Sequence, residues 1–556
     1  MKFLKRLRNR SKRRAGQAAS YEHLRSEGRK DPVSLRAAGV GGGGGVPGRD
    51  LTKALPPTVL SKIFSFVCPH ALDDSYDTSE ESMTEDGCML CDMRDLANCA
   101  QVCRRWRPEA QALLYSHVRI DAVHYCELEV ELAAKRKQRH FDRNGDPIDA
   151  PQVRLTLLMR TVRDSQALAD MVLSLRMPYM TREANKAELA RTISVLPNLR
   201  FVDLPAGLYG DDPSCLTLKQ ELIARCPDLR RMSYRHGAEG SFARLPNVQL
   251  WANLEVLELS GLYVDDNTIR FSLSSFPKLR VLTLEDLPWL EDSLFAPSQS
   301  LPQFPAVQRL TLRNTPNLTA SGLVALLSAP EVQQALLYLT LSSTGILPQD
   351  LHRVLSTAPR LRGLLVTQEV ARSFPAEQVP QLASQSLTLL HYEITSDTSG
   401  AYGMQPVATS YYTYLVGSLI SNKLPSLRDL YVRDANFPET LLLAPPPRLL
   451  AGSEARGPNP FRTGLARPLN VYSKGLDEFE WNFTPYEPPS TRGKRDSFTR
   501  PVSLQDAQLS RPWGGDARKS VLVGNGFGGF LAVPVEDGRP KSSGGFKRDS
   551  RQDIWR

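Results

Sequence analysis

Two short stretches near the start of the chain carry apolar residues at the spacing of one helical face. The first stretch has six of them, three or four positions apart: Leu55, Val59, Leu60, Ile63, Phe64 and Val67. Pro56 and Pro57 stand where this helix would begin, where a missing amide hydrogen costs nothing. The second stretch repeats the pattern on another helix: Leu96, Cys99, Val102, Cys103 and Trp106. Because two short amphipathic helices bury little by themselves, we expect a third helix or another protein to cover them.

A different pattern repeats through the middle of the chain. Its template is an apolar residue, two variable residues, an apolar residue, one variable residue and a third apolar residue. Matches begin at Leu199, Leu229, Leu254, Leu279, Val307, Leu336, Leu361, Leu387, Leu427 and Leu476. The early matches lie about 25 to 30 residues apart, in the range of leucine-rich repeats or just above it. Helical pieces fill the intervals, so we predict an α/β fold whose strand–helix units stack into a curved leucine-rich-repeat solenoid.

Alternate strand residues of such a solenoid line its concave face. The template places polar residues of both charges there, with one aromatic residue, and this composition suits recognition of a protein surface. The predicted target-binding residues are Glu258, Glu285, Thr311, Arg313, Thr340, Ser342, Tyr431 and Arg433. On the same face Arg235, Arg313 and Arg433 make a phosphate-reading pocket possible. His, Cys, Asp and Glu do not cluster there, so the face suggests neither a metal site nor a catalytic dyad.

The two helical stretches together resemble an F-box. The first reads L-P-x-x-V-L-x-x-I-F from Leu55, and the second reads D-L-x-x-x-x-x-V-C-R-x-W from Asp95. In that family the motif is a small helical module that docks onto the Skp adaptor of a cullin–RING ubiquitin ligase. The resemblance implies that the adaptor-binding residues are Leu55, Pro56, Val59, Leu60, Ile63, Phe64, Val102 and Trp106. It also implies that Cys103 belongs to the core of the module or to the same interface.

An F-box followed by leucine-rich repeats is similar to the substrate receptors of SCF-type ubiquitin ligases. By that resemblance the chain is not an enzyme and needs no cofactor. It would bind the Skp adaptor and the cullin–RING ligase through the F-box, and an unknown target protein through the repeats, in the nucleus and/or cytoplasm. The alternative is a ligase-independent scaffold that acts through its repeats alone. An acidic insert, residues 73–92, favours this alternative because it separates the two halves of the F-box and could obstruct assembly.

The insert begins DDSYDTSEESMTEDG, which is too acidic and too polar to bury. We therefore expect a loop extruded between two helices. Ser79, Ser82 and Thr84 are followed closely by acidic residues, which suits acid-directed kinases, and each phosphate would add roughly −1.5 to −2 charges. A solvated loop without a regulatory role is the other interpretation.

The chain has eight cysteines at irregular spacing, which is not the pattern of a disulfide framework and favours a reducing compartment. Cys88 and Cys91 form a C-x-x-C pair, and Cys99 and Cys103 follow. Four thiolates can hold zinc tetrahedrally. The second pair lies on the helix face that should pack, however, so we favour packed or free thiols and predict no metal.

The net charge of +9 suggests nucleic acid or an acidic membrane as a partner, but much of the excess lies in the tails. Three interpretations of MKFLKRLRNRSKRR stay open: a nuclear import signal, a membrane-surface or organelle-targeting helix, and a solvated tail. At the other end, Gly524, Gly526 and Gly529 match G-x-G-x-x-G, but Pro534 and Gly538 break the helix that a nucleotide site requires. We expect this apolar segment to dock onto the solenoid or onto a partner, and we predict no specific nucleic acid and no membrane span.

Composition divides the chain into five parts. They are a disordered basic tail with a Gly linker (1–50), the F-box (51–120), a connector (121–155), the solenoid (156–487) and a disordered tail rich in Pro, Gly and Arg (488–556). The intervals before Leu427 and Leu476 are longer than the others, so we expect loops that leave one edge of the solenoid there.

Overall fold

The computed structural model describes ten segments of the chain: residues 55–82, 88–121, 124–139, 148–248, 250–375, 379–396, 407–443, 467–476, 478–486 and 520–521. The predictions for the basic tail, for Thr84, for the loops at 397–406 and 444–466 and for the Gly524 to Gly529 motif lie outside them. The chain divides into two compact units, residues 1–56 and residues 57–556. The second unit contains all the helices and strands of the described segments.

The second unit begins with a helical module, residues 57–121. Its elements are α2 (Pro57–Ser65), η3 (Pro69–Leu72), α3 (Met89–Val102) and α4 (Trp106–Ser116). Pro57 opens α2, as its position predicts. Cys103 has an extended backbone, with φ −158° and ψ 165°, so α3 ends at Val102 and Trp106 starts a separate helix. The prediction of one continuous helix from Leu96 to Trp106 was therefore wrong.

Three short parallel strands form a first sheet in the order β1–β2–β3: β1 (His117–Arg119), β2 (Ser174–Arg176) and β3 (Phe201–Val202). The helices around them are α5 (Glu127–Arg139), α6 (Ala150–Asp164), α7 (Gln166–Ala169), α8 (Tyr179–Ala184), α9 (Lys186–Ile193), α10 (Ala206–Tyr209), η4 (Pro213–Cys215) and α11 (Leu216–Arg225). Arg119 and Arg176 end β1 and β2, and both are buried. Buried guanidinium groups require hydrogen-bond partners, which come from the acidic insert.

A second sheet has eleven strands in chain order. They are β4 (Arg231–Arg235), β5 (Val256–Ser260), β6 (Val281–Glu285), β7 (Arg309–Thr315), β8 (Tyr338–Thr344), β9 (Gly363–Val370), β10 (Leu389–Ser396), β11 (Asp429–Val432), β12 (Leu469–Ser473), β13 (Trp481–Tyr486) and β14 (Ser520–Val521). Strands β4 to β12 are parallel, and the last two pairings are antiparallel. The template matches from Leu229 to Leu427 each lead into a strand. The match at Leu476 does not, because β13 starts at Trp481, and β12 had no match.

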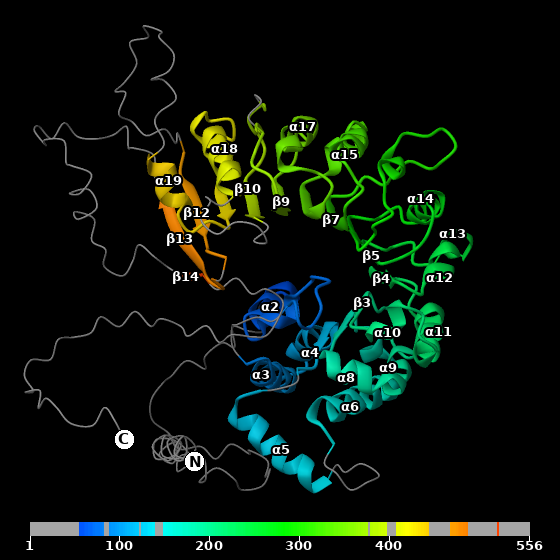
Figure 1. Ribbon diagram of the computed structural model, residues 1–556. Helices are drawn as coiled ribbons and strands as arrows, with labels where there is room; N and C mark the ends of the chain where they lie inside the picture. The colour runs from blue at the N-terminus through cyan, green and yellow to red at the C-terminus, as the bar shows by residue number, and fades with distance from the viewer. Residues whose placement is uncertain are drawn as a thin grey trace, which may run out of the picture. The chain divides into compact units, whose positions relative to one another are not determined.

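Helices between the strands lie on one side of this sheet (Figure 1). They are α12 (Glu239–Ala243), α13 (Leu245–Val248), α14 (Asp266–Ser274), η5 (Asp292–Phe295), α15 (Ala320–Leu327), α16 (Pro330–Ala335), η6 (Pro348–Asp350), α17 (Leu351–Thr357), α18 (Thr409–Ile420) and α19 (Phe437–Leu443). The predicted mixture of helices and strands is confirmed. Among the described residues, no helix combines the length and the apolar character needed to cross a membrane.

Equivalent residues of successive strands form continuous ladders because every pairing keeps the same register. One buried ladder runs along the helix-covered side: Met232, Leu257, Leu282, Leu310, Leu339, Leu364, Leu390, Leu430 and Val471. Backbone conformation repeats as well. Gly261, Asp286, Asn314 and Ser343 occupy equivalent positions and have positive φ angles of 65°, 55°, 50° and 51°. These four units therefore change backbone direction at the same register position and bury their leucines against the neighbouring units.

Candidate functional site

Helix α2 divides its apolar residues between two faces. Leu60 and Phe64 are buried, and the Phe64 ring meets the Trp106 ring edge-on at a centroid distance of 5.1 Å. Val59 and Ile63 on the helix and Phe66 just after it are 40%, 45% and 76% exposed. The buried pair fastens α2 to α4. The three exposed residues, named here the outer row, leave apolar surface open to a partner.

The eight predicted adaptor-binding residues are thus of two kinds. Leu60 and Phe64 are buried, and Trp106 is half-buried, with an indole nitrogen that is buried and unpartnered among the described residues. The other five are Leu55, which is half-buried, Pro56, Val59 and Ile63, which are exposed, and Val102, which is 61% exposed at the end of α3. The motif alone does not distinguish the two kinds, because both recur at helical spacing.

Two further residues correct the prediction for this module. Cys103 is exposed because the helix has already ended there, so its assignment to the core was wrong, and its place in the adaptor interface stays a prediction. Phe66 was expected to add apolar surface for docking but was not listed among the adaptor-binding residues, although it is the most exposed member of the outer row. The Lys62 ammonium group lies 5.4 Å from the centroid of the Phe66 ring. This is the distance range of a cation–π contact, which an exposed aromatic ring can make.

The first part of the acidic insert, residues 73–82, is not extruded. Arg176, at the end of β2, donates from Nε to the Asp77 carbonyl oxygen at 3.0 Å and from Nη2 to the Ser75 carbonyl oxygen, and it pairs with the Asp73 carboxylate at 3.3 Å. The expectation that this segment is too polar to bury holds for four of its five acidic residues, which are exposed, but it was wrong for Ser79, which is buried. Backbone carbonyl oxygens of the segment accept hydrogen bonds from guanidinium groups of the strands, and these bonds attach it to the protein.

Arg119, at the end of β1, holds the next turn of the insert. It donates to the Ser79 carbonyl oxygen at 2.9 Å and to the Ser82 carbonyl oxygen at 2.7 Å. Ser79 is buried, and the Ser82 hydroxyl accepts a further bond from Arg119 at 3.0 Å while donating to the Thr78 carbonyl oxygen at 2.7 Å. A kinase therefore cannot reach Ser79 unless the segment first detaches.

The insert also reaches the start of the large sheet. Arg231 on β4 donates to the Tyr76 carbonyl oxygen and pairs with Glu81 at 3.2 Å. Arg231 simultaneously pairs with Glu258 at 2.7 Å, one of the predicted target-binding residues. Acidic and backbone groups of residues 73–82 are thus held by arginines from β1, β2 and β4.

Asp203, directly after β3, completes this attachment. Its Oδ2 accepts the amide hydrogens of Ser79 at 3.0 Å and Met177 at 2.9 Å. Burial raises the pKa of Asp203 to about 6, against the lowering effect of those two amides and of the Arg182 guanidinium 3.9 Å away. Its other oxygen, Oδ1, is buried without a partner among the described residues, which is consistent with a carboxylate that is costly to ionise.

The predicted target-binding residues lie in two ladders on the side of the large sheet opposite the leucine ladder. Glu258, Thr311, Thr340 and Tyr431 occupy one ladder, and Glu285, Arg313 and Ser342 occupy the next. Arg433 follows β11 and donates to the Leu476 carbonyl oxygen at 3.2 Å. Thr311 is buried, so it offers little contact area.

Arg235, Arg313 and Arg433 do not form one pocket. Arg235 and Arg313 are equivalent residues of β4 and β7, three strands and therefore about 14 Å apart. Arg433 follows β11, four strands further on. The even strand spacing of the sheet thus spreads these guanidinium groups, and Arg313 already pairs with Glu285 at 3.7 Å.

An aromatic stack on the same side of the sheet was largely missed from the sequence. His391 and Tyr431 stack at 3.9 Å, Tyr431 and Tyr472 at 4.3 Å, and Phe483 continues the row at 5.2 Å from Tyr472. Trp481 meets Tyr431 edge-on at 5.2 Å. The template identified two of these positions only. The available signal for β12 was the alternation of apolar and polar residues from 469 to 473, which the template does not match.

A family model described as F-box-like matches residues 52–121 of the sequence. Residues 52–121 are an F-box-like domain. The resemblance noted in the two helical stretches is confirmed to that extent. No curated protein matches the chain.

Two solved structures resemble parts of the fold. The crystal structure of the Rad7 and Elc1 complex in yeast is 18% identical over 50% of this chain and 67% of that chain, with a TM-score of 0.34. The leucine-rich repeat-containing protein LegL7 from Legionella pneumophila is 14% identical over 50% of this chain and 81% of that chain, with a TM-score of 0.27.

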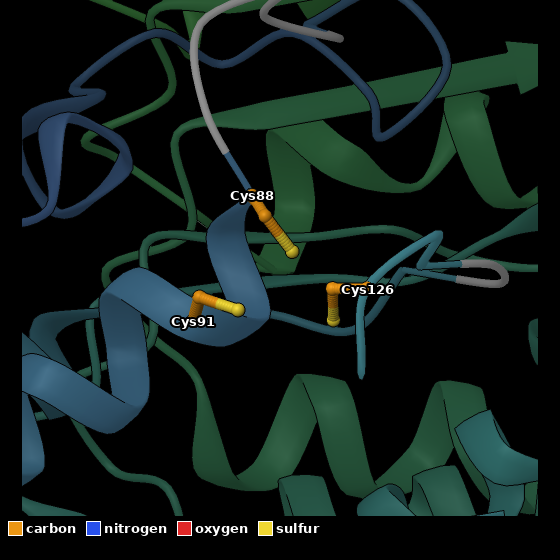
Figure 2. A group of neighbouring side chains, drawn as sticks. All are labelled: Cys88, Cys91 and Cys126. Carbon is orange, nitrogen blue, oxygen red and sulfur yellow. The ribbon is translucent and has the colours of Figure 1, made fainter. Parts of the chain in front are cut away.

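A cluster of cysteines lies at the edge of the F-box-like domain. The sulfur atoms of Cys88, Cys91 and Cys126 are all within 4.8 Å of one another (Figure 2). Cys99 and Cys103, the expected companions of the first pair, are not in the cluster. Burial raises the pKa of Cys91 to about 12. Burial also opposes ionisation of Cys126, but the Glu129 amide and the thiols of Cys88 and Cys91 lower its pKa below the usual value.

Proposed function

We propose that this chain is a non-catalytic substrate receptor of an SCF-type ubiquitin ligase. Its F-box-like domain would bind the Skp adaptor, and its strand–helix repeats, a leucine-rich-repeat solenoid, would bind a target protein. The outer row of Val59, Ile63 and Phe66 carries the proposal. These residues stay exposed beside a core that contains Leu60, Phe64 and Leu96, and exposed apolar surface of this kind marks a protein-binding site.

The buried residues of the domain support the same proposal, because they hold α2 in place while its other face stays exposed. Leu60 and Phe64 hold α2 against α4 and Trp106, so the helix can present Val59 and Ile63 without a partner to fold it. Interfaces of this kind derive most of their binding energy from a few desolvated apolar anchors. The chain itself would supply no chemical step, because its role is to raise the effective concentration of target lysines near the ligase.

The main argument for the ligase-independent scaffold is weakened. It rested on an acidic loop obstructing adaptor binding, whereas the described residues 73–82 are bonded to Arg119, Arg176 and Arg231 on the strands. A segment held there need not compete with an adaptor for the outer row. The alternative is tested by asking whether a cullin is recovered together with the adaptor.

We further propose that the target binds near β10 to β13, where the aromatic stack lies. The opposite end of the polar side, at β4, already holds the insert through Arg231. Tyr431, Tyr472 and Phe483 are half-buried and stacked, so they offer rigid aromatic area of the kind that dominates protein interfaces. Loss of retained target proteins in Tyr431→Ala, with adaptor binding kept, is the expected result.

The adaptor proposal is tested by co-purifying the full chain with the Skp adaptor and a cullin. Wild type should retain both, and Ile63→Asp should weaken adaptor binding by roughly 30-fold or more, about 2 kcal/mol. Phe479→Asp is a matched control, because Phe479 is 85% exposed and lies outside the domain. Equal thermal melting of both variants would show that folding is unchanged. Adaptor retention by Ile63→Asp, or equal loss with Phe479→Asp, would contradict the proposal.

A further inference from the structure

We propose that Cys88, Cys91, His124 and Cys126 bind one structural zinc ion. Cys88 caps the start of α3 and Cys91 lies in its first turn, while His124 and Cys126 come directly before α5. The side chains from these two places come together, and Figure 2 shows the three cysteine side chains as neighbours. Nothing in the proposed role in ubiquitination requires this site.

The separations suit tetrahedral coordination. Zinc–sulfur bonds of about 2.3 Å place two thiolate ligands about 3.8 Å apart on a tetrahedron. The three sulfur atoms already lie within 4.8 Å of one another, and the Nδ1 atom of His124 is 3.9 Å from the Cys88 sulfur. A contraction of about 1 Å would bring the three sulfur atoms to tetrahedral separations, and His124 would then approach from the Cys88 side as the fourth donor.

His124 is the fourth ligand that the structure offers. Its imidazole faces Cys88, and its Nε2 atom is buried without a hydrogen-bond partner among the described residues. Because Nδ1 faces Cys88, Nδ1 would be the ligand atom and Nε2 would carry the ring proton. Cys3His is an established donor set of closed, structural zinc sites.

The position of Cys126 is fixed by the start of α5. Cys126 precedes the first residue of that helix, and its carbonyl oxygen accepts the amide hydrogen of Glu129 at 3.1 Å. The ion would link the start of α5 to the start of α3. It would thereby cross-link two places in the chain that α3, α4 and β1 separate.

The first measurement is the metal content of the full chain, purified with a tag free of histidine, in reductant and without chelator. Elemental analysis should find one zinc ion per chain. Cys91→Ser and Cys126→Ser should reduce zinc to background, while Cys99→Ser and Cys103→Ser, on the same stretch of chain, should retain it. Replacement by cobalt should give the visible absorption of a tetrahedral thiolate site.

A second readout does not depend on whether the variants fold. In wild type, zinc should protect Cys88, Cys91 and Cys126 from alkylation and leave the exposed Cys103 reactive, and a chelator should remove that protection. A chain without zinc, a disulfide among the three cysteines under reducing conditions, or protection of Cys99 and Cys103 in place of Cys126 would each overturn the proposal.

Discussion

The strand repeats and the acidic insert are held in place by opposite means. In the repeats, residues such as Leu257, Leu284 and Leu312 have no exposed surface and lie in ladders of apolar neighbours. Residues 73–82 contain almost no apolar side chains and are held by hydrogen bonds and ion pairs from Arg119, Arg176 and Arg231. Apolar burial is non-directional and tolerates an approximate register, whereas the insert depends on a few donors at defined places.

This difference predicts how each region fails. Removing one leucine from a ladder leaves a cavity and weakens the cooperative unit as a whole. Removing one arginine leaves several carbonyl oxygens unsatisfied and should release the insert while the repeats stay folded. Three substitutions, taken in order of decreasing expected effect, test the contrast.

Leu284→Ala should have the largest effect. Leu284 is fully buried on β6 between Leu259 and Leu312, so we expect a loss of about 3 to 4 kcal/mol in the free energy of unfolding. Thr283→Ala, one residue earlier on the opposite side of the strand, should cost less than about 1 kcal/mol. Denaturant unfolding measures the free energy of unfolding of both variants. Equal losses in the two variants would contradict the claim that the leucine ladder stabilises the repeats.

Arg176→Met should cost about 2 kcal/mol and act locally. The substitution removes the donors to the Asp77 and Ser75 carbonyl oxygens and the ion pair with Asp73. Limited proteolysis should then cut within residues 73–82, while the repeats keep their melting temperature. Arg280→Met is the control, because Arg280 is 60% exposed and pairs with Glu255 outside the insert. An insert that stays protected in Arg176→Met would show that the arginine does not hold it.

Asp203→Asn should have the smallest effect and a dependence on pH. The pKa of Asp203 is about 6 in the folded chain and about 3.9 in an unfolded one. A raised carboxyl pKa means that the folded state binds the proton more tightly. Asp203 therefore contributes stability below about pH 4, and this contribution is lost as the pH rises to about 6.

The full pKa difference corresponds to no more than about 3 kcal/mol, and we expect about 1 to 2 kcal/mol after solvent relaxation. Asparagine keeps the oxygen that accepts from Ser79 and Met177 but cannot ionise. The difference in unfolding free energy between the variant and wild type should thus grow in favour of the variant from pH 4 to pH 7. A difference that does not change with pH would contradict the assignment.

The sequence was sufficient where stability comes from periodic apolar residues. The template matches from Leu229 to Leu427 lead into the strands β4 to β11, and the helical spacing around Leu60 located α2. It was insufficient where partners are distant in the chain. Arg176 lies about 100 residues after the insert that it binds. No local sequence pattern predicts that a charged strand residue will donate hydrogen bonds to backbone carbonyl groups so far away in the chain.

The candidate sites follow the same rule. The F-box motif specified which residues matter in α2, but not that Leu60 is buried while Ile63 is exposed, since that depends on the packing of Trp106 and α4. Spacing alone grouped Cys88 and Cys91 with Cys99 and Cys103, whereas the fold places Cys126 beside them. Cys126 follows Cys91 only after α3 and α4. Spacing in the sequence therefore does not indicate that the two cysteines are neighbours in the fold.

The most direct test of the proposed function is hydrogen exchange of the full chain with and without the Skp adaptor. Binding through the outer row predicts slower exchange across α2 and at the C-terminal end of α3, where Ile63 and Val102 are exposed. Residues 73–82 and strands β4 to β9 should exchange at unchanged rates. Protection confined to the insert or to the repeats, or no protection anywhere at saturating adaptor, would contradict the assignment of the outer row as the adaptor-binding surface.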